Sequence, residues 1–281
     1  MRRPELRALF FRRSVLLLWG FMLTILVAPF FAPHDIRSPE QVSTTQYQPP
    51  SPNHVMGTDN LDVDLFSKVL KGSQVSLIIA STATAITLAI GLAYGMICAI
   101  AGGWYDAVLM RITDISFSIP RFLILLAISS VVTEPLSVPQ LILLIGMTGW
   151  FDVARITRGE VAGLLKRDWV LAVQATGVGH LRLAARHIFP HLVPILVVMA
   201  TLGIGHTVVL EAGLMFLGAG GLNGSLGNLL QDGSGISSMT HWWMVFFPGL
   251  AIVLIVLACN ALGDALRDVF APEQVHAWPT T

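Results

Sequence analysis

Ionisable side chains inside long apolar stretches are the residues of this chain best placed to do chemistry. Asp114 and Arg121 lie in one such stretch, and His206 and Glu211 lie in another. A charged or polar group in an apolar environment is costly unless it is paired or hydrated. These four residues are therefore candidates for lining a polar path through the molecule.

The spacing of these residues refines their roles. Asp114 follows Arg111 by three residues, so the two can form a local pair on one helix face or belong to a gate. Pro120 frees a backbone carbonyl one turn earlier, which predicts a kink that lines a cavity, and Arg121 should face the bundle or water. His206 and Glu211 lie about 140° apart around a helix axis and do not share a face.

His206 is the best single candidate for contact with a solute or a coordinated metal. The alternative for a lone histidine in an apolar helix is a hydrogen bond to a neighbouring helix.

Several catalytic classes lack their motifs here. No phosphate-binding G-x-x-x-x-G-K-[ST] loop is present, so the chain does not bind ATP in that way, and we expect it to bind no cofactor. Ser225 and Ser234 lack a G-x-S-x-G frame, and no H-E-x-x-H helix exists, which argues against an intramembrane hydrolase. A formal net charge of zero argues against a nucleic-acid-binding protein. Cys98 and Cys259 fall within apolar runs and are interpreted as packing residues.

Composition then sets the fold class. The chain is 54% hydrophobic and 12% charged, against roughly 25% charged residues in a soluble domain, so it is predicted to be an all-α integral membrane protein. Segments of about twenty apolar residues can cross a bilayer. Six are expected, at 14–33, 74–101, 107–131, 137–156, 192–218 and 242–263.

The charge distribution predicts the orientation. Arginines cluster at 1–13, and basic residues recur at 155–186, so the positive-inside rule places both regions in the cytoplasm. Acidic residues dominate 34–73, and 219–241 has no Lys or Arg, so these two connections belong outside. Six spans then put both termini in the cytoplasm. A cleaved signal peptide at 14–33 is an alternative, although the length of this segment and the absence of a clean cleavage site favour an uncleaved anchor.

Small residues recur every four positions along the second expected span, which predicts a face where another helix approaches closely. They are Ala83, Thr87, Gly91, Gly95, Ala99 and Gly103.

A polar island at 155–191 separates two apolar runs. It is expected to form two short helices, with Ala172 and Ala175 on a small-residue face and Gly177 in a left-handed turn. Pro190 cannot continue the second helix regularly. The island would form an L-shaped surface that can enter a groove of another protein.

This spacing, from the small-residue helix through Gly177 to His187 and Pro190, resembles the "EAA" coupling loop of bacterial ABC-importer permeases. The resemblance implies a cytoplasmic loop that seats in a cleft of an ATPase subunit. The implied contact residues are Leu171, Ala172, Gln174, Ala175, Gly177, His187 and Pro190. Leu171 replaces the usual glutamate, and Val173 replaces the second alanine.

Three further segments narrow the resemblance to the dipeptide, oligopeptide and nickel permeases, in particular their C-type membrane subunit. They are Gly57 to Ser67, Met215 to Gly218, and the ending from Phe247 to Asp268. Asp62-Val63 stand where the family usually has Gly-Arg, which would turn a basic outer contact acidic. Leu226-Gly227 stand where it usually has Trp-Gly.

What the resemblance implies is a type I importer permease of the bacterial inner membrane. A cytoplasmic stub (1–13) and a first span (14–33) would precede an outer connection (34–73). A five-helix core (74–272) with the coupling loop (155–191) and a tail (273–281) would follow. The implied partners are a second permease subunit, one or two ATPase subunits that carry ATP and Mg, and a periplasmic or lipid-anchored solute-binding protein. Peptides and nickel or metallophore complexes stay open as substrates. The rival reading is a free-standing secondary transporter or channel.

Overall fold

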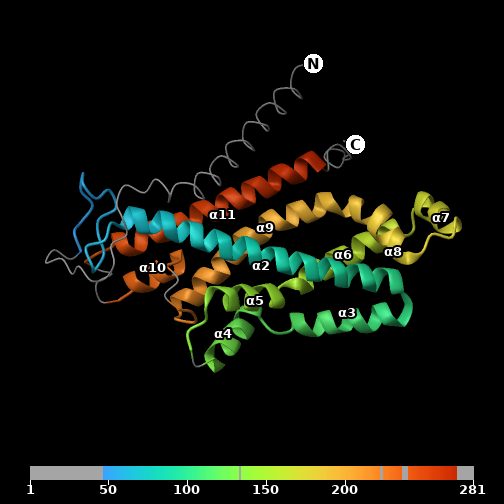
Figure 1. Ribbon diagram of the computed structural model, residues 1–281, viewed down its shortest axis with the longest axis horizontal. Coiled ribbons are helices and arrows are strands. Elements are labelled where there is room, and N and C mark those ends of the chain that lie inside the picture. Colours follow the sequence, from blue (N-terminus) through green and yellow to red (C-terminus); the bar gives the residue numbers. More distant parts are fainter. Residues whose placement is uncertain (1–46, 133, 222–223, 236–239, 271–281) are drawn as a thin grey trace, which may run out of the picture.

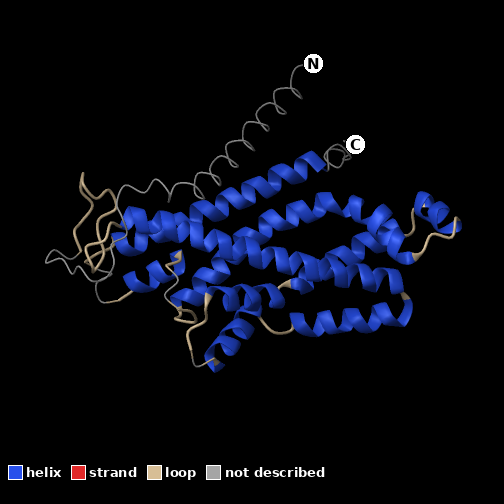
Figure 2. Ribbon diagram, viewed as in Figure 1, coloured by secondary structure: helices blue, strands red, loops and turns tan. Residues whose placement is uncertain are grey.

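A computed structural model describes residues 47–132, 134–221, 224–235 and 240–270. Within these residues the regular secondary structure is helical and no strand forms, which confirms the all-α prediction (Figure 2). The expected stub (1–13), first span (14–33) and tail (273–281) lie outside the described residues.

The helices follow one another with short connections (Figure 1). In chain order they are α2 (Leu65–Ala101), α3 (Gly103–Phe117), α4 (Arg121–Val131), α5 (Val138–Thr148), α6 (Trp150–Leu164), α7 (Asp168–Ala175), α8 (His180–Arg182), the π-helical segment η2 (Leu183–Ile188), α9 (Phe189–Phe216), α10 (Leu226–Gly233) and α11 (Trp243–Phe270).

Helix α2 begins at Leu65, whereas the sequence predicted a span from 74. The apolar pattern missed the first turns because Lys68 and Lys71 lie in them. Asp64 caps this end by accepting a hydrogen bond from the Ser67 amide at 2.9 Å. At 37 residues, α2 is about 55 Å long, which exceeds the roughly 30 Å hydrocarbon core. Its ends must therefore extend beyond the core.

Two expected spans are interrupted. The predicted span 107–131 divides into α3 and α4, which are bent by 76° around Ser118 to Pro120. The kink expected at Pro120 is thus confirmed, although it is sharper than a bend within one helix. The predicted span 137–156 divides into α5 and α6 at Gly149.

The number of membrane crossings therefore stays a prediction. Three described helical segments are long and apolar enough to cross a membrane, namely Leu65–Ala101, His180–Phe216 and Trp243–Phe270. A fourth crossing is added if α3 and α4 form one bent span.

The expectation of a short second helix in the polar island was wrong. The chain stays helical from His180 through Pro190 to Phe216. The irregularity imposed by Pro190, which lies in the first turn of α9, is the π-helical segment η2 just before it. Because a proline in a first turn gives up no required N–H donor, the helix continues into α9.

Helix α2 is central and packs against α5, α6 and α9, while α11 packs against α9 and α10. A side chain at Gly91 would meet Val153 of α6 at 2.4 Å, and one at Gly95 would meet the Ala154 carbonyl at 2.5 Å. The predicted small-residue seam is confirmed here. Gly103 does not belong to it, because α2 ends at Ala101 and Gly103 begins α3.

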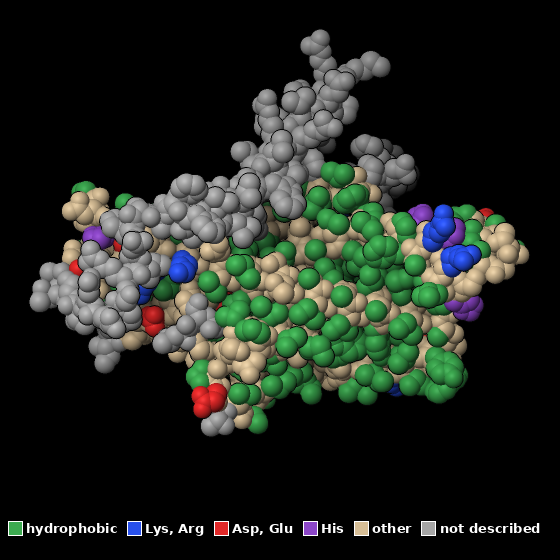
Figure 3. Space-filling view, viewed as in Figure 1, with side chains coloured by type: hydrophobic (Ala, Val, Ile, Leu, Met, Phe, Trp, Pro, Cys, Tyr) green, Lys and Arg blue, Asp and Glu red, His purple; other side chains and the backbone are tan. Residues whose placement is uncertain are grey.

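The two ends of the molecule differ in charge. Helix α7 and the segment after it protrude at one end with Arg and His side chains, whereas acidic residues lie beside Lys and His side chains at the opposite end, near the start of α2 (Figures 1 and 3). Figure 3 shows hydrophobic side chains over most of the surface between them. Cys98 and Cys259 are buried free thiols, as expected of packing residues.

The close approach of α2 and α6 can be tested at a single glycine. Gly91→Ala should lower the melting temperature of the purified complex, since the added Cβ overlaps Val153 at a cost of about 1–3 kcal/mol. Gly159→Ala on α6 is the matched control, because nothing lies within 4 Å of its new Cβ. Equal melting temperatures for both variants would contradict this packing.

Candidate functional site

The segment predicted to contact another protein contains the exposed helix α7. Leu171, Ala172, Gln174 and Ala175 are all exposed on it, and Leu171 retains 50% of its accessible surface. Two of the three remaining predicted contact residues lie on the helical arm that returns to the bundle. His187 is half-buried in η2, and Pro190 is exposed at the start of α9.

One buried side chain fixes α7 to this arm. Val170 is fully buried in a cluster with Leu183, Ile188 and Leu192. Next to it, the rings of Trp169 and His191 stack with centroids 4.8 Å apart. Val161 of α6 belongs to the same cluster, so α7 is anchored on α6 as well as on η2 and the start of α9. A push on α7 therefore acts on both α9 and α6.

Gly177 ends α7 in the predicted left-handed conformation, with φ = 79°. Its amide donates to the Gln174 carbonyl at 2.9 Å, and no atom lies within 4 Å of the position of a Cβ. The need for glycine here is therefore conformational and not steric.

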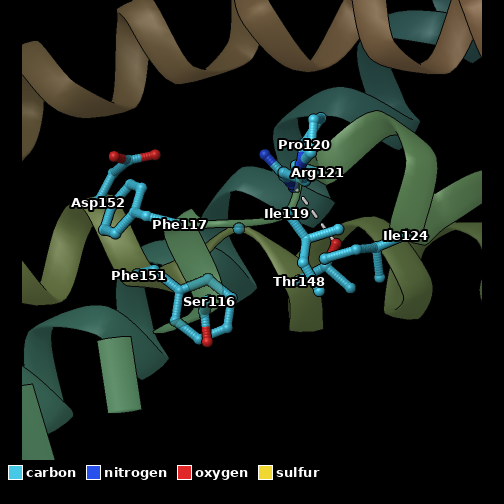
Figure 4. A pocket seen from close by; sticks show the side chains of 10 residues that line it. Ser116, Phe117, Ile119, Pro120, Arg121, Ile124, Thr148, Phe151 and Asp152 are labelled. Carbon is cyan, nitrogen blue, oxygen red and sulfur yellow. Dashed lines mark hydrogen bonds between the residues drawn. The ribbon is translucent and has the colours of Figure 1, made fainter. Parts of the chain in front are cut away.

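A second site lies where the two interrupted helices meet. A cavity of about 150 Å³ is lined by the end of α3, the start of α4, the end of α5 and the start of α6 (Figure 4). Its wall residues are Ser116, Phe117, Ile119, Pro120, Arg121, Ile124, Thr148, Gly149, Phe151 and Asp152. Arg121 and Pro120 were expected at such a cavity, and both line it.

Arg121, at the break between α3 and α4, contacts the end of α5 next to the break between α5 and α6. Its Nη2 donates to the Ile145 carbonyl at 2.6 Å, and its Nε lies 3.4 Å from the Thr148 hydroxyl. A Cβ at Gly149 would lie 2.5 Å from Nη2. The guanidinium thus satisfies a carbonyl near the end of α5, and a side chain at position 149 would displace it from this place.

Asp152 is the functional candidate that sequence reasoning missed. It lies in the first turn of α6, and Figure 4 shows it on the opposite side of the cavity from Arg121. His206 of α9 is exposed in this chain and lies within electrostatic range of both Arg121 and Asp152. An acidic residue within the predicted span 137–156 was the signal that could have identified it.

Asp114 pairs with a residue other than the one expected. Its carboxylate accepts from Arg155 of α6 at 2.7 Å, and not from Arg111. The Arg155 guanidinium also lies 4.0 Å from the ring centroid of Phe117, a cavity residue. The Asp114–Arg155 and Asp106–Arg158 ion pairs together join α3 to α6. The expectation of a local Arg111–Asp114 pair was wrong because tertiary packing brings α6 closer to the carboxylate.

The structure places Glu211 away from the cavity. It is fully buried, and the Ser76 hydroxyl of α2 donates to its Oε2 at 2.9 Å. The same hydroxyl accepts from the Leu226 amide of α10 at 3.2 Å. Glu211 therefore links α2, α9 and α10 inside the bundle, and it does not join His206.

The described residues contain no group of three or more His, Cys, Asp and Glu side chains arranged to hold a metal ion. Within that part of the chain, His206 consequently has no companions for a stable metal site.

The departure at Asp62-Val63 has a local explanation. Asp62 has φ = 59°, a conformation that glycine adopts freely and aspartate tolerates better than most residues. The Gln48 side-chain amide donates to its carboxylate at 2.9 Å. Val63 is 8% exposed and therefore packs inward. At the other site only Leu226 departs from the usual Trp-Gly. Gly227 is retained, and it lies so close to Ala212 and Met215 of α9 that a Cβ would overlap them.

Glu211 offers a test of a structural against a transport role. Glu211→Gln keeps an acceptor for Ser76 and should alter stability little. Glu211→Leu removes this acceptor from a buried hydroxyl and should destabilise the fold by about 1–3 kcal/mol. Thermal unfolding and yield of the detergent-solubilised complex measure both variants. Wild-type stability of Glu211→Leu combined with a loss of uptake would contradict the structural role.

Comparisons with known proteins agree with this arrangement. Residues 91–275 match the family described as "Binding-protein-dependent transport system inner membrane component". A peptide permease protein of Brucella suis biovar 1 is 33% identical over 263 residues, which cover 92% of this chain and 86% of that protein. The oligopeptide transport system permease protein OppC of Bacillus subtilis is 32% identical over 272 residues, which cover 94% of this chain and 87% of that protein.

The dipeptide transport system permease protein DppC of Bacillus subtilis is 32% identical over 260 residues, which cover 92% of this chain and 80% of that protein. Among solved structures, a chain of the inward-facing MetNI methionine ABC transporter superposes with a TM-score of 0.55 at 19% identity, covering 72% of this chain and 97% of that one. This likeness supports the fold. The chain therefore belongs to the family of binding-protein-dependent transport system inner membrane components, the permease subunits of ABC importers.

Proposed function

We propose that the chain is one of two permease subunits in an ATP-driven importer of short peptides, with α7 seated on a cytoplasmic ATPase. The observation that carries the proposal is the exposed, firmly anchored α7 in a chain whose relatives are peptide permeases. The same relatives favour peptides over nickel or a metallophore complex. Family membership supports a permease over the rival free-standing secondary transporter or channel.

Charge supports an orientation with α7 in the cytoplasm of a bacterial cell and both termini on that side of the inner membrane. Lys166, Arg167, Arg182 and Arg186 surround α7, while Asp59, Asp62 and Asp64 lie at the start of α2. Positive charge near membrane spans stays inside. The solute-binding protein would then dock at the end formed by α10 and the start of α2.

The path of force follows from the anchoring of α7. ATP and Mg would bind the partner ATPases, whose closure would move α7. Because Val170 and Trp169 hold α7 against η2 and the start of α9, the movement passes into α9. Helix α9 carries His206, which lies near Arg121 and Asp152. A rigid movement of α9 would thus change the environment of the cavity and turn it from one side to the other.

The orientation can be measured by labelling introduced cysteines. Val55→Cys should react with a membrane-impermeant maleimide in intact cells, since Val55 is 67% exposed at the outer end. Ala175→Cys should react only after the membrane is permeabilised. The native thiols Cys98 and Cys259 are buried and give little background. Labelling of Ala175→Cys in intact cells would contradict the orientation.

Coupling can be tested at Gly177. Gly177→Val should abolish ATP-dependent uptake while the chain still inserts, because a β-branched residue at φ = 79° costs on the order of 1–3 kcal/mol and misdirects α7. Gly179→Val is the matched control, since Gly179 has φ = −64° and open space around it. Crosslinking of Ala175→Cys to the ATPase reports docking. Unchanged uptake and crosslinking in Gly177→Val would rule out α7 as the transmission element.

A further inference from the structure

The cavity between the helix breaks has charges of both signs on opposite walls. Arg121 and Asp152 both line it (Figure 4). They do not form an ion pair with each other, and Asp152 is in no ion pair among residues 47–132, 134–221, 224–235 and 240–270. Neither charge is therefore neutralised by the other.

Arg121 keeps donors for a ligand. Its contacts with the Ile145 carbonyl and the Thr148 hydroxyl use two N–H groups, whereas a guanidinium carries five. These contacts also hold the side chain in place, so it can receive an anion without being reorganised. A planar guanidinium matches a carboxylate by donating two parallel hydrogen bonds.

Asp152 provides the complementary charge. It is exposed in this chain, in the first turn of α6, and its carboxylate can accept from an ammonium group. Unpaired charges inside a membrane are costly, and a ligand that carries both charges would offset the cost at both walls together. Phe117, Phe151, Ile119 and Ile124 make the rest of the lining mostly apolar, which suits varied side chains.

We propose that this cavity is a binding site for a zwitterionic short peptide in transit, with Arg121 receiving its α-carboxylate and Asp152 its α-ammonium. The inference rests on the proposed function and specifies its substrate contact. The free space in the cavity is about 150 Å³. A ligand that presents both charges to the two walls must be small, and the proposed function makes this ligand a short peptide.

Binding is measured on the assembled complex of both permease subunits and the ATPases, without the solute-binding protein, whose own preference would mask the cavity. The probes are Ala-Ala, Ala-Ala amide and N-acetyl-Ala-Ala, followed by equilibrium dialysis. Ala-Ala should bind at least roughly tenfold more tightly than either blocked peptide, because each block removes one charge-assisted contact.

Substitutions at Arg121 and Asp152 test which residue binds which terminus of the peptide. Arg121→Gln should weaken Ala-Ala to the level of its amide and abolish the difference between them. Asp152→Asn should do the same for Ala-Ala and its N-acetyl form. Arg111→Gln and Glu160→Gln are matched controls that remove the same charges from exposed positions of α3 and α6, and they should bind as wild type does.

Several outcomes would overturn the site. One is the absence of saturable Ala-Ala binding, and another is equal binding of all three peptides to the wild-type complex. If the complexes with Arg121→Gln or Asp152→Asn fail to assemble, the same binding measurements are made with Arg121→Lys and Asp152→Glu, which keep the charges. Complexes with these substitutions that bind Ala-Ala and both blocked peptides with wild-type affinities would show that the two side chains do not contact the peptide.

Uptake by the complete importer separates this inference from the proposed function. ATP-dependent uptake of Ala-Ala without any discrimination in the binding experiment would leave peptide import standing and remove the site. Failure of the complete importer to take up any peptide would remove the proposed function itself.

Discussion

The Arg121 guanidinium occupies the point where two interrupted helices meet, and the surrounding structure depends on its being satisfied there. A break in a helix exposes backbone carbonyls, which lipid cannot solvate. Arg121 meets this requirement for α5 through the Ile145 carbonyl, and the bend at Pro120 is what brings it there. Glycine at 149 leaves the space for this position of the guanidinium, because a Cβ there would push it aside. The cavity exists because these requirements are met together.

The same bundle separates a rigid part from a part arranged to move. Helix α2 is held close to α6 by Gly91 and Gly95, and Glu211 joins α2 to α9 and α10 through Ser76. Fully buried glycine contacts allow little sliding of α2 along α6, because packed interiors have few alternative arrangements. Glu211 holds α9 to α2 only near the end of α9 that is remote from η2. Helix α7 projects from the opposite end, and its one fixed side is the Val170 cluster. Force applied to α7 thus reaches the bundle through α6 as well as through η2 and α9.

Three residues that depart from the family pattern fit their local structural surroundings. Asp62 replaces a usual glycine, and its positive φ explains why glycine suits the position and why aspartate is a tolerated substitute. Val63 replaces a usual arginine, and it packs inward where a charge could not remain unpaired. Leu171 replaces a usual glutamate on α7, yet it stays exposed and leaves the small face of Ala172 and Ala175 open.

Local features of the chain were determined by the sequence alone. Apolar composition specified helices in a membrane, Pro120 specified a break, Gly177 specified a left-handed turn, and the small residues of α2 specified a close helix contact. Each is a property of one residue type or of one helical repeat. The partners of the charges were decided by the tertiary structure. Asp114 pairs with Arg155 and not with its neighbour Arg111, Glu211 joins three helices, and Asp152 lies across a cavity from Arg121 without pairing with it. Such pairings depend on which helices pack together, and a one-dimensional pattern carries no information about that.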